Sequence, residues 1–112
     1  MAKVIISEEL KNEILKKFRE KSKKIFRLMY SLKESPKKGK PVGQVGGILI
    51  KELRYKSFRF YFITDGFKLK ILNLEELSNL LIEFVRMSDK KSQQKTIEEI
   101  KGILKKFGKE KF

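Results

Sequence analysis

The sequence contains no cysteine and no histidine. Their absence excludes disulfides, thiol nucleophiles, most zinc sites and an imidazole general base. Any chemistry that the chain performs must therefore use lysine, arginine, tyrosine, aspartate or glutamate side chains. We expect no metal ion and no other cofactor.

Long apolar runs are also lacking. No segment approaches the roughly 20 apolar residues that a membrane-spanning helix requires. The stretch from Met1 to Ser7 lacks the apolar core of a signal peptide. The sequence therefore predicts a cytoplasmic protein without a membrane role.

Positive charge is present in excess. Lysine and arginine number 28 against 14 aspartates and glutamates, which gives a net charge of +14 over 112 residues. Such an excess favours nucleic acid, an acidic protein or an anionic membrane surface as the partner over a small neutral molecule. The length is that of one domain, residues 1–112.

The N-terminal third predicts a short strand and a helical hairpin. Val4 to Ile6 is a β-branched run, and Ser7 with the acids after it suits a helix N-terminus. Two apolar stripes at helical spacing follow, separated by the charged stretch Glu20 to Lys24. Ser35-Pro36 ends the second helix, because the proline ring disfavours an α conformation at the preceding residue. A basic loop, Lys37 to Val45, comes next.

After the basic loop the apolar period becomes that of strands. Within Phe58 to Phe62, phenylalanines alternate with Arg59 and Tyr61. One side of this strand is therefore expected in the core, and the other carries a cation beside a phenol. Asp65-Gly66 is a hairpin signal, so Phe67 to Leu72 is predicted as a further strand.

The next segment predicts a short helix and a strand. Asn73 and Glu76 form a capping pair for a helix that ends near Leu80, and Leu81 to Met87 is apolar enough for a strand. One longer helix over Leu74 to Leu81 is an open alternative.

A final helix completes the predicted fold. Thr96 and Glu99 match a capping box, an apolar stripe follows, and Gly108 closes the helix. The sequence thus predicts the α+β class, with the N-terminal helical hairpin packed on a mostly antiparallel, four-stranded twisted sheet and a C-terminal helix.

Three arginines fall on the predicted strands. Arg54 precedes the aromatic strand, Arg59 lies within it beside Tyr61, and Arg86 lies near the end of the last strand. Converging arginines would stabilise a pentacoordinate phosphate during RNA cleavage, while a lysine, tyrosine or carboxylate moves protons. The alternative, which composition favours, is that Lys51, Arg54 and Arg59 are solvated residues on the open face of a sheet.

The lysines of the basic loop allow two interpretations. Lys37, Lys38 and Lys40 surround Gly39 and Pro41. They suit a loop that contacts phosphates, and they suit a mobile, solvated loop equally well.

The order of these motifs resembles a known toxin family. The segments that carry the resemblance are Glu52-Leu53-Arg54, then Phe58-Arg59-Phe60-Tyr61-Phe62, then Lys90-Lys91-Ser92 with Lys95-Thr96 before the last helix. With the strand and helical hairpin ahead of them, they resemble the RelE/ParE toxin superfamily, and most closely its HigB-like, phage-derived branch. The resemblance spans nearly the whole chain and implies a RelE-like fold.

This resemblance implies the toxin of a type II toxin-antitoxin pair, most often an endoribonuclease that cuts mRNA in the ribosomal A site. Attack by the 2'-hydroxyl of the RNA would give a 2',3'-cyclic phosphate without a metal. Arg59 and Arg86 would stabilise the phosphorane, Lys51 and Arg54 would hold the backbone, and Tyr61 or a lysine would move the proton. The implied RNA-binding residues are Arg54, Lys90, Lys91, Lys95, Lys37, Lys38 and Lys40.

The chain departs from the family at the proton-transfer groups. Many members use a histidine or a C-terminal tyrosine, and this chain has neither; Thr64 to Leu80 is also an additional piece. The candidates that remain for proton transfer are Tyr61, Lys51, Glu52 and Asp89. For Tyr61 the alternative is a half-buried strand residue, and for Glu52 it is an ion pair with Arg54 or Lys51.

The resemblance also names partners. An acidic antitoxin is expected, together with the ribosome and mRNA, and no small-molecule substrate. Two alternatives stay open: ParE-like members inhibit DNA gyrase and cut no RNA, and a non-enzymatic RNA-binding or interaction module would keep the fold without the catalysis.

Overall fold

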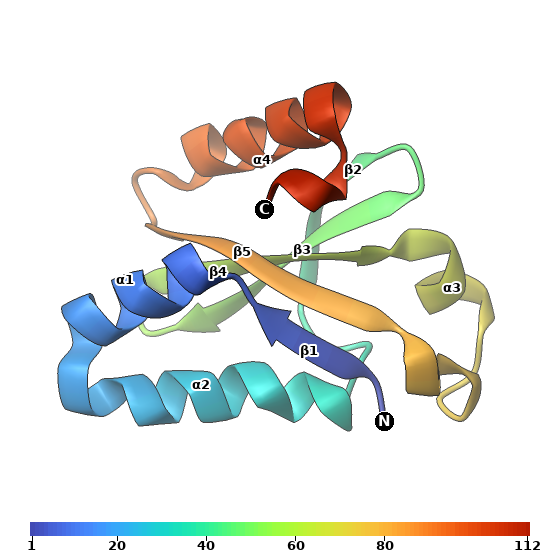
Figure 1. Cartoon of the computed structure of the whole chain (residues 1–112), viewed down its shortest axis with the longest axis horizontal. Coiled ribbons are helices and arrows are strands. Elements are labelled where there is room, and N and C mark those ends of the chain that lie inside the picture. The colour runs from blue at the N-terminus through green and yellow to red at the C-terminus, as the bar shows by residue number, and fades with distance from the viewer.

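The computed structural model describes residues 1–112 and contains one five-stranded sheet (Figure 1). The strands are β1 (Lys3–Ile6), β2 (Lys40–Val45), β3 (Ile48–Tyr55), β4 (Phe58–Asp65) and β5 (Leu81–Asp89). Their spatial order is β1-β5-β4-β3-β2. β1 pairs with β5 in parallel, and every other neighbouring pair is antiparallel. The expected α+β class is confirmed, but the sheet is mixed and has one strand more than predicted.

Four α-helices accompany the sheet: α1 (Glu8–Phe18), α2 (Ser22–Tyr30), α3 (Gly66–Ile71) and α4 (Gln93–Phe107). Short 3₁₀ turns occupy Arg19–Lys21, Ser31–Lys33, Glu76–Asn79 and Lys109–Lys111. The Ser7 hydroxyl accepts a hydrogen bond from the Leu10 N–H at 3.3 Å, so α1 begins where its cap predicts. None of the helices has the length and apolar character needed to cross a bilayer.

The two sides of the sheet carry separate cores, with α1 and α2 on one side and α4 on the other (Figure 1). The side beneath the first two helices, here the hairpin face, buries Leu53, Phe60 and Phe62 against α1 and α2. The opposite side, here the α4 face, buries Ile50, Tyr61, Ile63 and Val85 against Ile97, Ile100 and Leu104. β4 is therefore buried on both sides, and the expectation of an open sheet face around Arg59 is wrong.

The predicted strand at Phe67 to Leu72 is wrong, because this segment contains helix α3. Asp65 does not form a hairpin turn; its carboxylate accepts a hydrogen bond from the Lys68 N–H at 3.0 Å and caps the helix. The alternating sequence of α3 fits a strand and a short helix equally well, and the cap decides between them. As a helix it buries Leu69 and leaves Phe67 exposed.

Asn73 and Glu76 cap each other reciprocally, at 3.1 and 3.0 Å, as their spacing predicts. They introduce a 3₁₀ turn, Glu76–Asn79, rather than the longer helix that was the alternative.

The structure also differs from the sequence prediction in the basic loop and at the start of the last helix. The basic loop contains β2, which pairs with β3 and has an irregularity between Pro41 and Gly43. Helix α4 begins at Gln93, ahead of the predicted cap at Thr96. The Asp89 carboxylate accepts from the Ser92 N–H at 2.8 Å, and the Ser92 carbonyl accepts from the Thr96 N–H at 3.0 Å, so the turn before the helix is already ordered.

Candidate nucleic-acid interface

Three strand ends and the start of α4 meet at one edge of the α4 face. In the sheet register Arg54 of β3 lies opposite Arg59 of β4, and Arg59 lies opposite Ser88 of β5. Lys90 and Lys91 follow directly in the turn that leads into α4. We call this group the arginine edge: Glu52, Arg54, Arg59, Lys90, Lys91 and Gln93.

Glu52 is the centre of the arginine edge. Its Oε2 lies 3.2 Å from Arg54 Nε and 3.8 Å from Arg59 Nε. Its Oε1 accepts a hydrogen bond from the side-chain amide of Gln93 at 3.1 Å. One carboxylate thus faces two guanidinium groups, and the cluster keeps an excess of positive charge.

The members of this cluster differ in their access to solvent. The Glu52 side chain is 1% exposed, that of Arg59 is 6% exposed, and that of Arg54 is 57% exposed. Arg59 donates to the Ser57 carbonyl at 3.2 Å, while its buried Nε has no hydrogen-bond partner. Arg59 is thus an under-satisfied buried cation, and Arg54 is the guanidinium that an incoming anion meets first.

Tyr61, the sequence candidate for proton transfer, is fully buried beneath α4. Its hydroxyl lies 2.7 Å from Ser88 Oγ, which also donates to the Asp89 carbonyl at 2.9 Å. Burial raises the pKa of the Tyr61 phenol, only partly opposed by the hydrogen bond with Ser88. A buried, hydrogen-bonded phenol of raised pKa is placed to support the sheet, not to exchange protons with RNA.

Lys51 lies on the opposite side of the sheet from the arginines. Its Nζ donates to the Lys37 carbonyl at 2.9 Å and lies 5.9 Å from the centre of the Phe62 ring, in the hairpin-face core. Burial lowers the pKa of Lys51. The structure therefore separates Lys51 from Arg54 and Arg59, which contradicts the prediction that they form one site.

Arg86 does not pair with Glu52, the carboxylate that Arg54 and Arg59 share. A bulge between Tyr61 and Phe62 places Arg86 opposite Tyr61. Arg86 Nε donates to Glu99 of α4 at 2.7 Å, and its guanidinium lies 5.2 Å from the Phe112 ring centre. Two of the three predicted arginines share the Glu52 carboxylate, whereas the third, Arg86, pairs with Glu99 and ties β5 to α4.

The predicted RNA-binding lysines are all exposed, and none forms an ion pair. Lys40 of β2 lies directly opposite Glu52 of β3 in the strand register, so it lies beside the arginine edge. Lys90, Lys91 and Lys95 flank the start of α4. Lys37 and Lys38 precede β2, and Lys37 is tied to Lys51 on the hairpin face, which separates it from this group.

Sequence reasoning undervalued Glu52 and missed Gln93. Glu52 was a candidate whose pairing with Arg54 was the simpler alternative, and that pairing is present. The doubled glutamine at the start of α4 was the available signal for Gln93.

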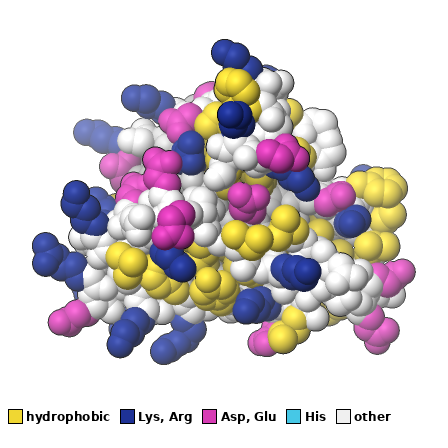
Figure 2. All heavy atoms as spheres, viewed as in Figure 1, with side chains coloured by type: hydrophobic (Ala, Val, Ile, Leu, Met, Phe, Trp, Pro, Cys, Tyr) yellow, Lys and Arg dark blue, Asp and Glu magenta, His cyan; other side chains and the backbone are white.

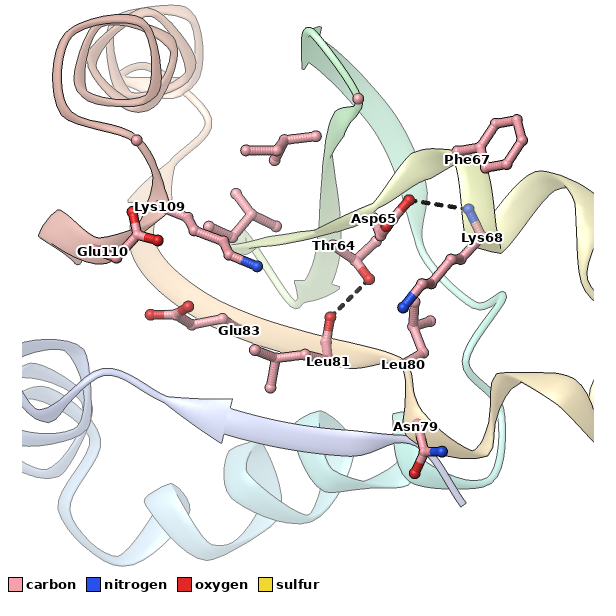
Figure 3. A pocket seen from close by; sticks show the side chains of 14 residues that line it. Thr64, Asp65, Phe67, Lys68, Asn79, Leu80, Leu81, Glu83, Lys109 and Glu110 are labelled. Atoms are coloured by element: carbon pink, nitrogen blue, oxygen red, sulfur yellow. Dashed lines mark hydrogen bonds between the residues drawn. The ribbon is translucent and has the colours of Figure 1, made fainter.

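A cleft of about 600 Å³ lies at the other end of the α4 face (Figure 3). Figure 3 shows Thr64, Glu83, Lys109 and Glu110 around it. Burial raises the pKa of Glu83, and the nearby Lys109 charge opposes this shift. No arginine and no predicted site residue lines this cleft, so it is separate from the arginine edge.

Comparisons of the chain with protein-family models, curated proteins and solved structures found no match.

Proposed function

We propose that this chain is a RelE/ParE-like toxin that binds and cuts ribosome-associated mRNA at the arginine edge. The observation that carries the proposal is the shared carboxylate: Glu52 faces both Arg54 and Arg59, and unpaired lysines surround them. Two guanidiniums on one carboxylate attract a further anion, and the phosphodiester of RNA fits that need. The proposed location is the cytoplasm, where mRNA is translated, and the proposed regulatory partner is an acidic antitoxin.

The proposed chemistry transfers the base role from Tyr61 to Glu52. A phosphate that engages Arg54 and Arg59 draws the exposed Arg54 guanidinium away from Glu52 and frees the carboxylate oxygen that Arg54 had held. Glu52 then takes the proton of the 2'-hydroxyl as the 2'-oxygen attacks phosphorus. The bond from phosphorus to the 5'-oxygen breaks, a lysine of the edge protonates that oxygen, and a 2',3'-cyclic phosphate remains. Arg59, preorganised by burial, stabilises the charge that develops on the phosphorane.

The test is primer extension on a reporter mRNA in a translating extract, with naked RNA as a further substrate. Arg54→Gln is the informative variant, because Arg54 is mostly exposed, whereas Arg59→Ala would remove a buried side chain and one of the two cations that face the buried Glu52. Arg27→Gln, an exposed arginine on α2, is the matched control. Ribosome-dependent cuts that weaken in Arg54→Gln and not in Arg27→Gln support the proposal. Absence of cuts overturns the cleavage step.

A second function is favoured by a specific observation. Glu52 is 1% exposed and both its oxygens are engaged, and the Tyr61 hydroxyl is buried. A closed proton-transfer set of this kind fits a domain that binds RNA and does not cleave it. RNA binding without cuts in the same extract would assign this second function. If the protein instead inhibits the supercoiling activity of DNA gyrase and has no effect on RNA, both the cleavage function and the RNA-binding function are excluded.

A further inference from the structure

A second cleft, about 550 Å³, lies between α3 and the chain that leads into β2. Leu49, Phe67 and Leu69 give it apolar walls, and Lys37 and Lys70 stand on its rim. No aspartate or glutamate lines it, in contrast to the larger cleft on the α4 face. A volume of this size lies within the range of sites that hold a ligand or an anchoring side chain.

Phe67 of the cleft is followed along the chain by two further exposed apolar residues. Phe67, Ile71 and Leu74 are 66%, 56% and 62% exposed, and they lie within one short segment of a highly charged chain. Figure 2 shows hydrophobic side chains gathered at the right of the molecule, where Figure 1 places α3. Asp65 caps α3, so Phe67 and Ile71 belong to an ordered helix, and Leu74 lies in the turn that follows. Exposed apolar groups clustered in this way mark an interaction surface.

Buried residues hold the backbone of the rim lysine Lys37 in place. The buried Lys51 amine donates to the Lys37 carbonyl at 2.9 Å. Gly39 packs so closely that an added Cβ would lie 2.8 Å from the Phe62 ring. The segment before β2 is therefore fixed against the hairpin-face core, and neither Lys37 nor Lys70 has an acidic partner within the protein.

We propose that this cleft docks an acidic segment of a partner protein. Apolar side chains of that segment would pack between Leu49, Phe67 and Leu69, and its carboxylates would meet Lys37 and Lys70. Charge complementarity is the argument for the occupant, because the rim carries cations and no acid while the walls are apolar. Lys51 becomes a positioning residue for Lys37 instead of a catalytic one.

This docking surface lies far from the arginine edge. Arg59 is near the start of β4 and Asp65 is at its end, which separates the two sites by roughly 20 Å along an extended strand. RNA and the partner segment therefore bind without competing. The inference does not rest on the proposed function, since it needs neither RNA binding nor cleavage.

The test uses a synthetic amphipathic peptide of about 15 residues, long enough to form a helix, with leucine and glutamate on adjoining faces. One control peptide has glutamine in place of every glutamate, and another has serine in place of every leucine. Binding to the full chain is measured by fluorescence anisotropy and located by backbone amide shifts. Phe67→Ser is the test variant and Phe107→Ser, 52% exposed on α4 and outside the cleft, is the matched control.

We expect the acidic peptide to bind and the two control peptides not to bind. The backbone amide shifts should change at α3 and at Lys37. Phe67→Ser should weaken its binding about tenfold or more, as loss of a central aromatic anchor does, and Phe107→Ser should not. The combined Lys37→Gln and Lys70→Gln variant should bind the acidic and glutamine peptides equally. RNA binding should be unchanged in Phe67→Ser, so failure here is distinguishable from failure of the proposed function.

Four outcomes would overturn the inference. The first two are no binding of the acidic peptide, and equal binding of the acidic and glutamine peptides to the unmodified protein. The third is a set of amide shifts confined to the arginine edge. The fourth is a concentration-dependent dimer that Phe67→Ser abolishes, which would assign the cleft to a second copy of the chain.

Discussion

Arg59 Nε lies 3.8 Å from Glu52 Oε2 on the neighbouring strand, and both side chains are almost completely buried. A buried guanidinium is tolerated only with a charge partner, and Glu52 is the single carboxylate in contact with it. The same contact fixes the geometry of the arginine edge, because Arg54 and Gln93 converge on that carboxylate as well. Stability and the proposed RNA site therefore depend on one pair.

Replacing Glu52 should be costly. Glu52→Gln leaves the Arg59 charge buried without compensation, so we expect a loss of about 3 kcal/mol in the free energy of unfolding. Glu99→Gln is the control, because Glu99 pairs with Arg86 at the surface, where an ion pair contributes at most about 1 kcal/mol. Urea denaturation measures both. Equal losses in the two variants would show that the buried pair has no special role.

Tyr61→Phe separates a structural role from a catalytic one. The variant removes the hydroxyl that lies 2.7 Å from Ser88 Oγ, while the aromatic ring continues to fill the core under α4. We expect a loss of about 1 kcal/mol in stability, the typical value for one hydrogen bond, and unchanged activity on RNA. Thermal denaturation and primer extension provide the two readouts. A large fall in cleavage by a folded Tyr61→Phe protein would restore Tyr61 as the proton-transfer group.

The pKa of Lys51 predicts a rise of stability with pH. Burial holds this pKa below its usual 10.5, so between the lowered value and 10.5 the unfolded chain binds more protons than the folded one. Unfolding free energy increases with pH wherever this holds. The native protein should therefore gain stability relative to Lys51→Met as pH approaches 10.5 from below.

Denaturation of both proteins across that window measures the gain, and titration of the other groups cancels in the difference. Parallel stability curves for the two proteins would show that the Lys51 amine keeps an ordinary pKa.

Arg54→Gln should reduce the salt dependence of RNA binding. Each phosphate contact to single-stranded RNA contributes about 0.7 to the slope of log affinity against log salt, so the slope should fall by that amount if Arg54 contacts a phosphate. Arg27→Gln on α2 should leave the slope unchanged. Titration of a fluorescent RNA at several salt concentrations provides the slopes, and identical slopes for all three proteins would remove Arg54 from the interface.

Some of this site was accessible from the sequence and some was not. Residues an odd number of positions apart in a strand point to opposite sides, so the separation of Lys51 from Arg54 follows from their numbers alone. The hairpin-face core of β4 was predicted by its alternating phenylalanines. The burial of Arg59 was not, because its charge is neutralised by Glu52 of a different strand, and strand pairing is not visible in a single sequence.

The position of Arg86 was equally hidden. The bulge between Tyr61 and Phe62 changes the register of β5, and no local residue pattern marks it. Helix α3 was missed because its alternating lysines and apolar residues match a strand, while the Asp65 cap matches a turn signal. Both errors occur where strand pairing or a helix cap, and not the local residue pattern, sets the structure.

The central claim is that RNA lies on the arginine edge, and NMR titration of the isotopically labelled protein with a short single-stranded RNA tests it most directly. At physiological salt we predict the largest changes at the Arg54 side chain and at the backbone amides of Lys90 and Gln93, with α2 and α3 unaffected. Changes confined to Lys37 and α3, or no saturable change at all, would contradict the claim.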